Sequence, residues 1–416
     1  MHRRVFVRDS ALALVTMGLS PTFLRRTALG MELPQAARGK VLICLFQRGA
    51  ADALNIVIPF GERAYYALRP AIAIAPPSRA SGGGGAMDLD GFFGLHPALA
   101  PLKPLWDRGL LAPIHAVGSP SATRSHFDAQ DYMESATPDN KGTSDGWLNR
   151  YLATSGTCEQ CAVTPFRAVA MTPQTPRALQ GSAPSVAMNS VADFTVRSGG
   201  AQAAQLEALY RTGSADLIHG TGTEMFEAVK MLRAANPQRY QPEHGATYPA
   251  SQFGRRLLSI AQLIKAGVGL EVAFADVGGW DTHVNQGGAT GQLAQRLGDF
   301  SASIAALVTD LGDRMQDVVI LTMSEFGRMA RQNGSGGTDH GHAGAMLAIG
   351  GAVKGQRVVG RWPGLAPELL YDGRDLALTT DFRDVFAEVA SGHLGATRLD
   401  ALFPGYTPAS VPGVLG

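Results

Sequence analysis

The sequence contains few cysteines. Among its 416 residues there are three, Cys44, Cys158 and Cys161. Cys158 and Cys161 form one C-x-x-C pair, which supplies two of the four ligands that a structural zinc site needs and is consistent with one local disulfide in an oxidising compartment. Cys44 lies in an apolar run and is expected in the core. The cysteines therefore indicate neither redox chemistry nor a complete cysteine zinc site.

The chain also lacks a strong net charge. Lys and Arg number 36 and Asp and Glu 35, which gives a formal charge of +1. Five Arg and one Asp lie in the first thirty residues, so the remainder carries 31 basic and 34 acidic side chains, a net charge of −3. This balance does not provide the basic face that neutralises nucleic-acid phosphates. We expect no nucleic acid as a partner.

The N-terminal apolar run, residues 11–19, is too short to cross a bilayer, which takes roughly 20 residues. It follows Arg3 and Arg4 in the sequence "RRVFV". Residues 1–30 are therefore predicted to be a twin-arginine export signal, and a short amphipathic helix is the alternative. This predicts a periplasmic or secreted protein that engages the twin-arginine export machinery and keeps no permanent membrane span. Export in the folded state favours a metalloprotein.

The rest of the chain alternates between apolar runs and amphipathic segments. From Gln292 to Gly312, apolar residues recur every three or four positions, which predicts a helix with one buried stripe. Uninterrupted apolar runs predict strands that are buried on both faces. Their alternation with helices predicts an α/β fold with a largely parallel sheet. The runs are 41–47, a second run from Leu54, 110–118, 166–171, 270–275 and 318–322.

Polar residues follow several of these runs, where ligands of such sheets bind beyond the carboxyl ends of the strands. The residues are Asp52, Ser125, Asp281 with His283, and Glu325. In an extended segment Asp281 and His283 can point the same way, which suits two ligands of one metal. Alternatively, Asp281 caps a turn and His283 is solvated.

A glycine-rich loop follows Glu325 and ends in Asp339-His340-Gly341-His342. Its glycines would let the backbone approach a small bound group closely. We expect Glu325 and a histidine of this loop to bind metal. Whether His340 or His342 is the ligand stays open, since one could orient the other through a hydrogen bond. The alternative is a mobile loop with exposed histidines.

Ser125, with Asp128 three residues later, has the pattern of a helix N-cap. The same helix end would offer unpaired amides to an anionic substrate, and Ser125 could then serve as a nucleophile. Arg124 could clamp an anion through its planar fork of donors.

These polar groups occupy equivalent places in successive strand and loop units. Acids and imidazoles that hold one or two ions, together with a nucleophile, suit a hydrolase that cleaves a small anionic ester of phosphate or sulfate. Zinc is the expected divalent metal, and manganese and calcium are the alternatives.

The motifs of the chain resemble those of an uncharacterised family of twin-arginine-exported bacterial proteins within the alkaline phosphatase and sulfatase superfamily. The similarity covers nearly the whole chain and rests on the arginine pair and on "LFQRGAADALNIVIPFG", "RSHFDAQDYME", "GGWDTHVNQ" and "SEFGR…GTDHGHAGAMLAIGG". The resemblance implies an alkaline phosphatase-like domain, a three-layer α/β sandwich, over residues 39–416, with residues 154–250 as an irregular insertion or cap.

The resemblance also implies roles for individual residues. Ser125 would be the nucleophile, and the metal ligands would be Asp52, Asp281, His283, Glu325 and either His340 or His342. Phe326 stands where the alkaline phosphatases have a histidine. This difference favours the alternative function, a non-catalytic binding or assembly protein on a degenerate scaffold, with another exported protein as its partner.

Overall fold

The computed structural model describes residues 39–78, 84–155, 165–191, 240–409 and 411–416. The predicted export signal, Cys158 and Cys161 lie outside these residues. An eight-stranded sheet forms the centre, and every neighbouring pair in it is parallel except the two that involve β10. This confirms the predicted α/β class with a largely parallel sheet. In spatial order the strands are β11 (Thr380–Asp381), β5 (Leu111–Gly118), β10 (Gly344–Gly350), β9 (Val318–Met323), β1 (Val41–Arg48), β8 (Val272–Gly278), β6 (Ala168–Met171) and β7 (Val186–Ala187).

The central strand β1 explains why the apolar runs are uninterrupted. Ile43 and Leu45 pack into one hydrophobic cluster, while Leu42 and Cys44 pack into a second cluster on the opposite face. A strand with successive side chains on opposite faces needs apolar residues at every position when both faces are covered. Cys44 is buried, as expected, and is a free cysteine.

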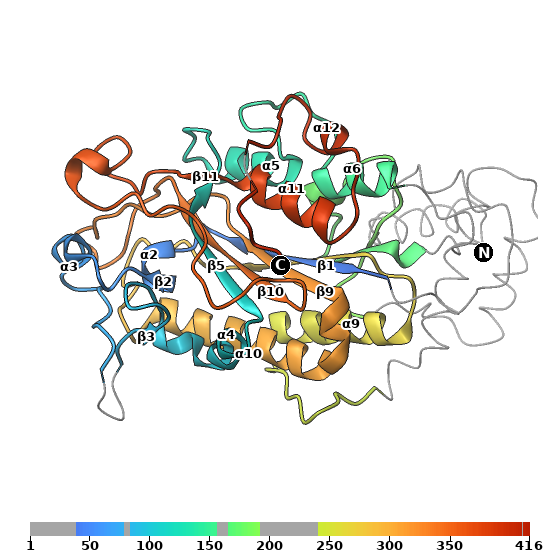
Figure 1. Ribbon diagram of the computed structural model, residues 1–416, viewed down its shortest axis with the longest axis horizontal. Helices are drawn as coiled ribbons and strands as arrows, with labels where there is room; N and C mark the ends of the chain where they lie inside the picture. Colours follow the sequence, from blue (N-terminus) through green and yellow to red (C-terminus); the bar gives the residue numbers. More distant parts are fainter. Residues whose placement is uncertain (1–38, 79–83, 156–164, 192–239, 410) are drawn as a thin grey trace, which may run out of the picture.

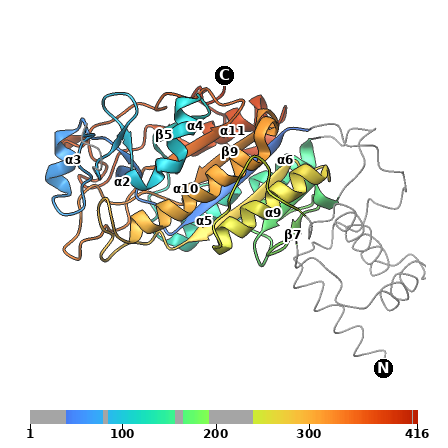
Figure 2. The ribbon, with the colours of Figure 1, turned by 90° about the horizontal axis from the view of Figure 1, so that it is seen from below.

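Helices pack on both faces of the sheet, an arrangement compatible with a three-layer sandwich (Figure 1). Figure 2 shows α9 and α10 side by side along one of these faces. The helices of this face are α9 (Gln252–Ala266), α10 (Gln292–Leu311) and α4 (Lys103–Asp107), which follows the 3-10 helix η2 (Pro97–Leu102). Those of the other face are α5 (His126–Ser135), α6 (Trp147–Thr154), α11 (Phe382–Gly392) and α12 (Leu399–Leu402). The bounds of α10 confirm the predicted amphipathic helix.

The apolar run from Leu54 differs from its prediction. It forms one helical turn, α2 (Ala53–Ile56), and then β2 (Val57–Ile58), because a short run that is buried all round does not distinguish helix from strand. Strand β2 belongs to a small sheet with β4 (Gly94–Leu95) and β3 (Met87–Asp88). The remaining elements are α3 (Arg63–Leu68), η3 (Pro165–Arg167), η4 (Arg177–Leu179), η6 (Gly312–Asp317) and η7 (Pro367–Leu369).

Part of the segment expected to be an insertion or cap contributes to the main sheet. Within residues 154–250, the structure describes 154–155, 165–191 and 240–250, and residues 165–191 supply the strands β6 and β7. Both strands continue the parallel pairing beyond β8, so this part extends the edge of the sheet.

Strand direction brings distant segments to one edge. The strands β1, β5, β8 and β9 run the same way, so their carboxyl ends meet, and the antiparallel strand β10 begins at the same edge. We call this the carboxyl edge of the sheet. Among the described residues, no helix is long and apolar enough to cross a membrane.

Candidate metal centre

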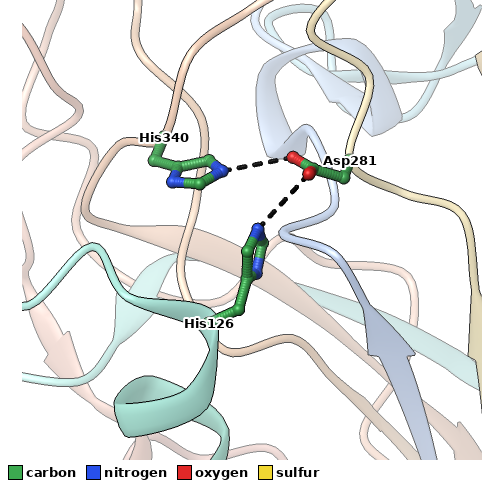
Figure 3. A group of neighbouring side chains, drawn as sticks. All are labelled: His126, Asp281 and His340. Carbon is green, nitrogen blue, oxygen red and sulfur yellow. Dashed lines mark hydrogen bonds and ion pairs between the residues drawn. The ribbon is translucent and has the colours of Figure 1, made fainter.

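Three side chains from separate segments meet at the carboxyl edge. His126 is the first residue of α5, Asp281 follows β8, and His340 precedes β10. Figure 3 shows the three side chains pointing toward one another, with the Asp281 carboxylate between the two imidazoles. Their possible ligand atoms all lie within 4.8 Å of one another. We refer to this group as the His-Asp-His cluster.

The Asp281 carboxylate is the centre of the cluster. Its Oδ1 lies 3.2 Å from His340 Nε2 and its Oδ2 lies 3.5 Å from His126 Nε2. A further imidazole, His283, brings its Nε2 to 3.0 Å from Oδ1. Partial burial is the largest single influence and would raise the pKa of Asp281, but the charge and hydrogen bond of Arg328, at 2.5 Å, together with the neighbouring imidazoles lower that pKa. Asp281 is therefore an anion that faces three imidazoles.

An acceptor at Nδ1 fixes the orientation of each imidazole. When Nδ1 carries the proton, Nε2 of the neutral ring presents a lone pair, and metal-binding histidines are commonly held in this way. Each acceptor is a carboxylate or a backbone carbonyl. The pairs are His126 Nδ1 with Glu325 Oε1 at 2.8 Å, His340 Nδ1 with the Arg124 carbonyl at 3.0 Å, and His283 Nδ1 with Asp339 Oδ1 at 3.1 Å.

The converging lone pairs fit a divalent cation. The Nε2 atoms of His283 and His340 lie 3.0 Å apart, a distance at which either an N–H···N hydrogen bond or a shared cation joins the two rings. His126 Nε2 is buried and has no hydrogen-bond partner among the described residues. Ligand atoms around a tetrahedral zinc ion are about 3.3 Å apart. The separations of 3.0 to 3.5 Å between Asp281 and the imidazoles are close to that value.

Glu325, a predicted ligand, lies behind His126. Its side chain is fully buried, and its Oε1 also accepts hydrogen bonds from the Gly49 amide at 2.8 Å and from Gln130 Nε2 at 2.9 Å. Burial opposes ionisation, but the hydrogen bonds from His126 and Gln130 keep the pKa of Glu325 below its usual value. In turn, the hydrogen bond to Glu325 raises the pKa of His126. In this position Glu325 orients His126 toward Asp281.

Two other predicted ligands have different surroundings. Asp52 is buried, and its Oδ2 accepts hydrogen bonds from Arg69 Nη1 at 2.5 Å and from Gln286 Nε2 at 2.6 Å. His342 stacks on Tyr371, with ring centroids 4.1 Å apart, and burial lowers its pKa. Neither residue belongs to the His-Asp-His cluster. Of the two histidines in the Asp-His-Gly-His motif, the structure therefore brings His340 to Asp281.

Ser125 and Arg124 lie at the start of α5. Ser125 is exposed and is the N-cap, and its Oγ accepts a hydrogen bond from the Asp128 amide at 3.5 Å, as the sequence pattern predicted. Arg124 Nη2 donates to Asp375 at 2.6 Å and to Asp372 at 3.2 Å. An anion bound by this group would have to compete with two carboxylates.

The residue that the sequence interpretation missed is His126. The capping pattern drew attention to Ser125 and Asp128, although a histidine between them, shortly after a buried strand, was itself a signal. Phe326 packs against the rings of both His126 and His340, with centroid distances of 5.0 Å in each case. It therefore forms an apolar wall that supports two of the imidazoles.

Glycines allow the segments of the site to approach one another. Gly49 has φ +120°, and a Cβ there would lie 2.7 Å from the backbone nitrogen of Asp281. A Cβ on Gly337 would lie 2.3 Å from the carbonyl oxygen of His283. These glycines bring the loop after β1 and the loop before β10 against the segment that carries Asp281 and His283.

Together, the sheet and the cluster define an α/β protein with a candidate divalent-metal site at the carboxyl edge. The family model described as "Protein of unknown function (DUF1501)" matches residues 113–401, and the chain belongs to this family. The matched residues include His126, Asp281, His283 and His340. No curated protein and no solved structure matches the chain.

Proposed function

We propose that the chain is an exported, metal-dependent hydrolase of phosphate or sulfate esters, built on an alkaline phosphatase-like scaffold. The observation that carries this proposal is the convergence of three imidazole Nε2 atoms on Asp281, with an acceptor bonded to each Nδ1. A donor set of imidazoles and one carboxylate suits zinc, whereas manganese and calcium prefer sites built mostly from oxygen.

The position and exposure of the cluster favour a catalytic rather than a purely structural metal. The carboxyl edge of a parallel sheet is where α/β proteins bind ligands. The side chains of Asp281 and His283 are 43% and 38% exposed, so a small anion can reach them. His126, Asp281 and His340 alone would leave one tetrahedral position open, as in catalytic zinc sites, whereas His283 as a fourth ligand would close the site, so the catalytic proposal takes the first three as the ligands. When bound, the ion would polarise the ester and lower the pKa of a bound hydroxyl group.

Ser125 is the proposed nucleophile because its neighbours on both sides contribute to the site. The carbonyl of Arg124 holds His340, and the ring of His126 faces Asp281. In the proposed reaction, Ser125 Oγ forms a bond to phosphorus or sulfur as the bond to the ester oxygen breaks and the alcohol leaves. The Ser125 Oγ proton is released and the leaving oxygen takes up a proton to become the alcohol. Water then cleaves the serine ester, which releases phosphate or sulfate and restores the hydroxyl group.

A comparison of two Ser125 variants tests this role. Ser125→Ala removes both the hydroxyl and the helix cap, while Ser125→Asn removes the hydroxyl and keeps a capping side chain. With zinc bound, both variants are expected to lower kcat for 4-nitrophenyl phosphate or sulfate at least about a thousandfold and to keep their metal. Ser391→Ala, an exposed serine on α11, serves as the control.

The activities of the two Ser125 variants and of the wild type distinguish a serine nucleophile from a metal-bound water nucleophile and from a non-catalytic protein. If Ser125→Asn restores the activity that Ser125→Ala loses, Ser125 is only a cap. If both variants stay active while a chelator abolishes hydrolysis, metal-bound water is the nucleophile. If the metal-loaded wild type turns over no ester in a broad panel, the chain is a binding or assembly protein on a hydrolase-like scaffold.

A further inference from the structure

Exposed apolar side chains gather in the segments that build the candidate metal centre. Among the described residues, four large hydrophobic side chains are exposed, two of them lie in these segments, and a third lies close to them in the chain of contacts around Arg124. Phe127 directly follows His126, Val284 directly follows His283, and Leu369 precedes the turn whose carboxylates pair with Arg124. The fourth, Val411, lies near the C-terminus.

Phe127 is the most exposed of the four, at 89%. Leaving a phenylalanine in water forgoes the stabilisation that burial provides, and this exposed side chain is the direct neighbour of a residue of the cluster. Helix α5 packs into the protein through Ala129 and Met133, which are buried. Successive residues of a helix point about 100° apart. The His126 ring enters the cluster, while the Phe127 ring, on the next residue, is exposed to solvent; we call the exposed side chains that neighbour the cluster residues the rim.

Exposed carboxylates near the metal centre limit the negative charge that a bound ligand can carry. Asp339 and Asp372 have side chains that are 52% and 54% exposed. Asp372 is paired with Arg124, so Asp339 is the exposed carboxylate that would repel additional anionic groups on a ligand. A ligand whose single anionic group reaches the metal centre would therefore have to place an uncharged remainder along this rim.

We propose that Phe127 and Val284 bind the apolar remainder of the substrate, an alkyl or aryl group carried by a phosphate or sulfate monoester. This inference rests on the proposed function and specifies its substrate class. It favours hydrophobic monoesters over nucleotides and polyphosphates, whose leaving groups carry further negative charge. Phe127 is then a residue that determines specificity and takes no part in the chemical step.

Alkyl phosphonates of increasing length test the inference without any turnover. Binding of methyl, butyl and octyl phosphonate to the zinc-loaded protein is measured by isothermal titration calorimetry. The wild type is expected to bind octyl phosphonate at least about tenfold more tightly than methyl phosphonate, because each buried methylene adds affinity. Phe127→Ser is expected to remove most of this ratio. Val411→Ser, which replaces an exposed valine away from these segments, keeps the full ratio.

Three results would overturn the inference. Equal affinity of the wild type for methyl and octyl phosphonate would do so, and so would an unchanged ratio in Phe127→Ser. The third is self-association of the wild type that Phe127→Ser abolishes, with the same octyl-to-methyl affinity ratio in both proteins. The exposed side chains would then form a subunit interface. If the ratio behaves as expected but no ester is hydrolysed, the apolar subsite stands and the proposed hydrolase activity fails.

Discussion

Replacement of His340 by alanine is expected to lower the affinity of the protein for zinc more than about a hundredfold, while replacement of His342 leaves it nearly unchanged. The two histidines are separated by one glycine and differ in their surroundings. His340 places its Nε2 3.2 Å from Asp281 and is held through Nδ1 by the Arg124 carbonyl. His342 instead stacks on Tyr371. Losing a direct ligand should cost more than the tenfold to hundredfold typical of residues that only orient a ligand.

Competition with a chromogenic zinc chelator measures the affinities of the wild type and both variants. Circular dichroism spectra establish that each variant is folded, which matters for His342 because it is buried. A His340→Ala variant that binds zinc as tightly as the wild type would remove His340 from the metal centre. Loss of zinc in a folded His342→Ala variant would contradict the assignment of the two histidines.

Arg328→Met is expected to lower the free energy of unfolding by about 3–5 kcal/mol, because each buried acceptor that loses its donor costs about 1–3 kcal/mol. Arg328 is fully buried and pairs with Asp281. It also donates hydrogen bonds to backbone carbonyls of three loops, so its removal would leave these carbonyls without a buried partner. The carbonyls belong to Gly49 and Ala50 after β1, Trp280 after β8 and Thr338 before β10.

Urea denaturation of Arg328→Met and Arg398→Met gives the comparison. Arg398 pairs with Asp400 on the surface, where both side chains are mostly exposed, and exposed pairs contribute little to stability. The Arg398 variant should therefore unfold at nearly the wild-type urea concentration. Equal midpoints for the two variants would show that Arg328 does not hold the three loops together.

The sequence allowed the central sheet to be predicted because strands covered on both faces leave a clear signal. Apolar runs identified β1, β5, β6, β8 and β9, and the helical stripe identified α10. The strand β2 was harder to predict from the sequence, because the residues before it form a buried helical turn with the same apolar character. Pairing order and the antiparallel direction of β10 depend on tertiary contacts that no local pattern records.

The candidate site was predictable in its location, since polar residues after several strands share one edge of the sheet. The sequence could not assign the role of each side chain. Asp52 and Glu325 are carboxylates in similar positions after strands, yet Asp52 pairs with the buried Arg69 and Glu325 orients His126. These roles depend on partners far away in the chain, and His126 itself was concealed within a helix-capping pattern.

The metal content of the wild-type protein tests the central claim most directly. Elemental analysis of the purified full-length protein, without added metal, should give a stoichiometric divalent ion, with zinc as the expected element. Removing that ion with a chelator should lower the melting temperature, and adding zinc back should restore it. Protein that contains no stoichiometric metal, and whose melting temperature responds to neither chelator nor zinc, would contradict a metal centre at His126, Asp281 and His340.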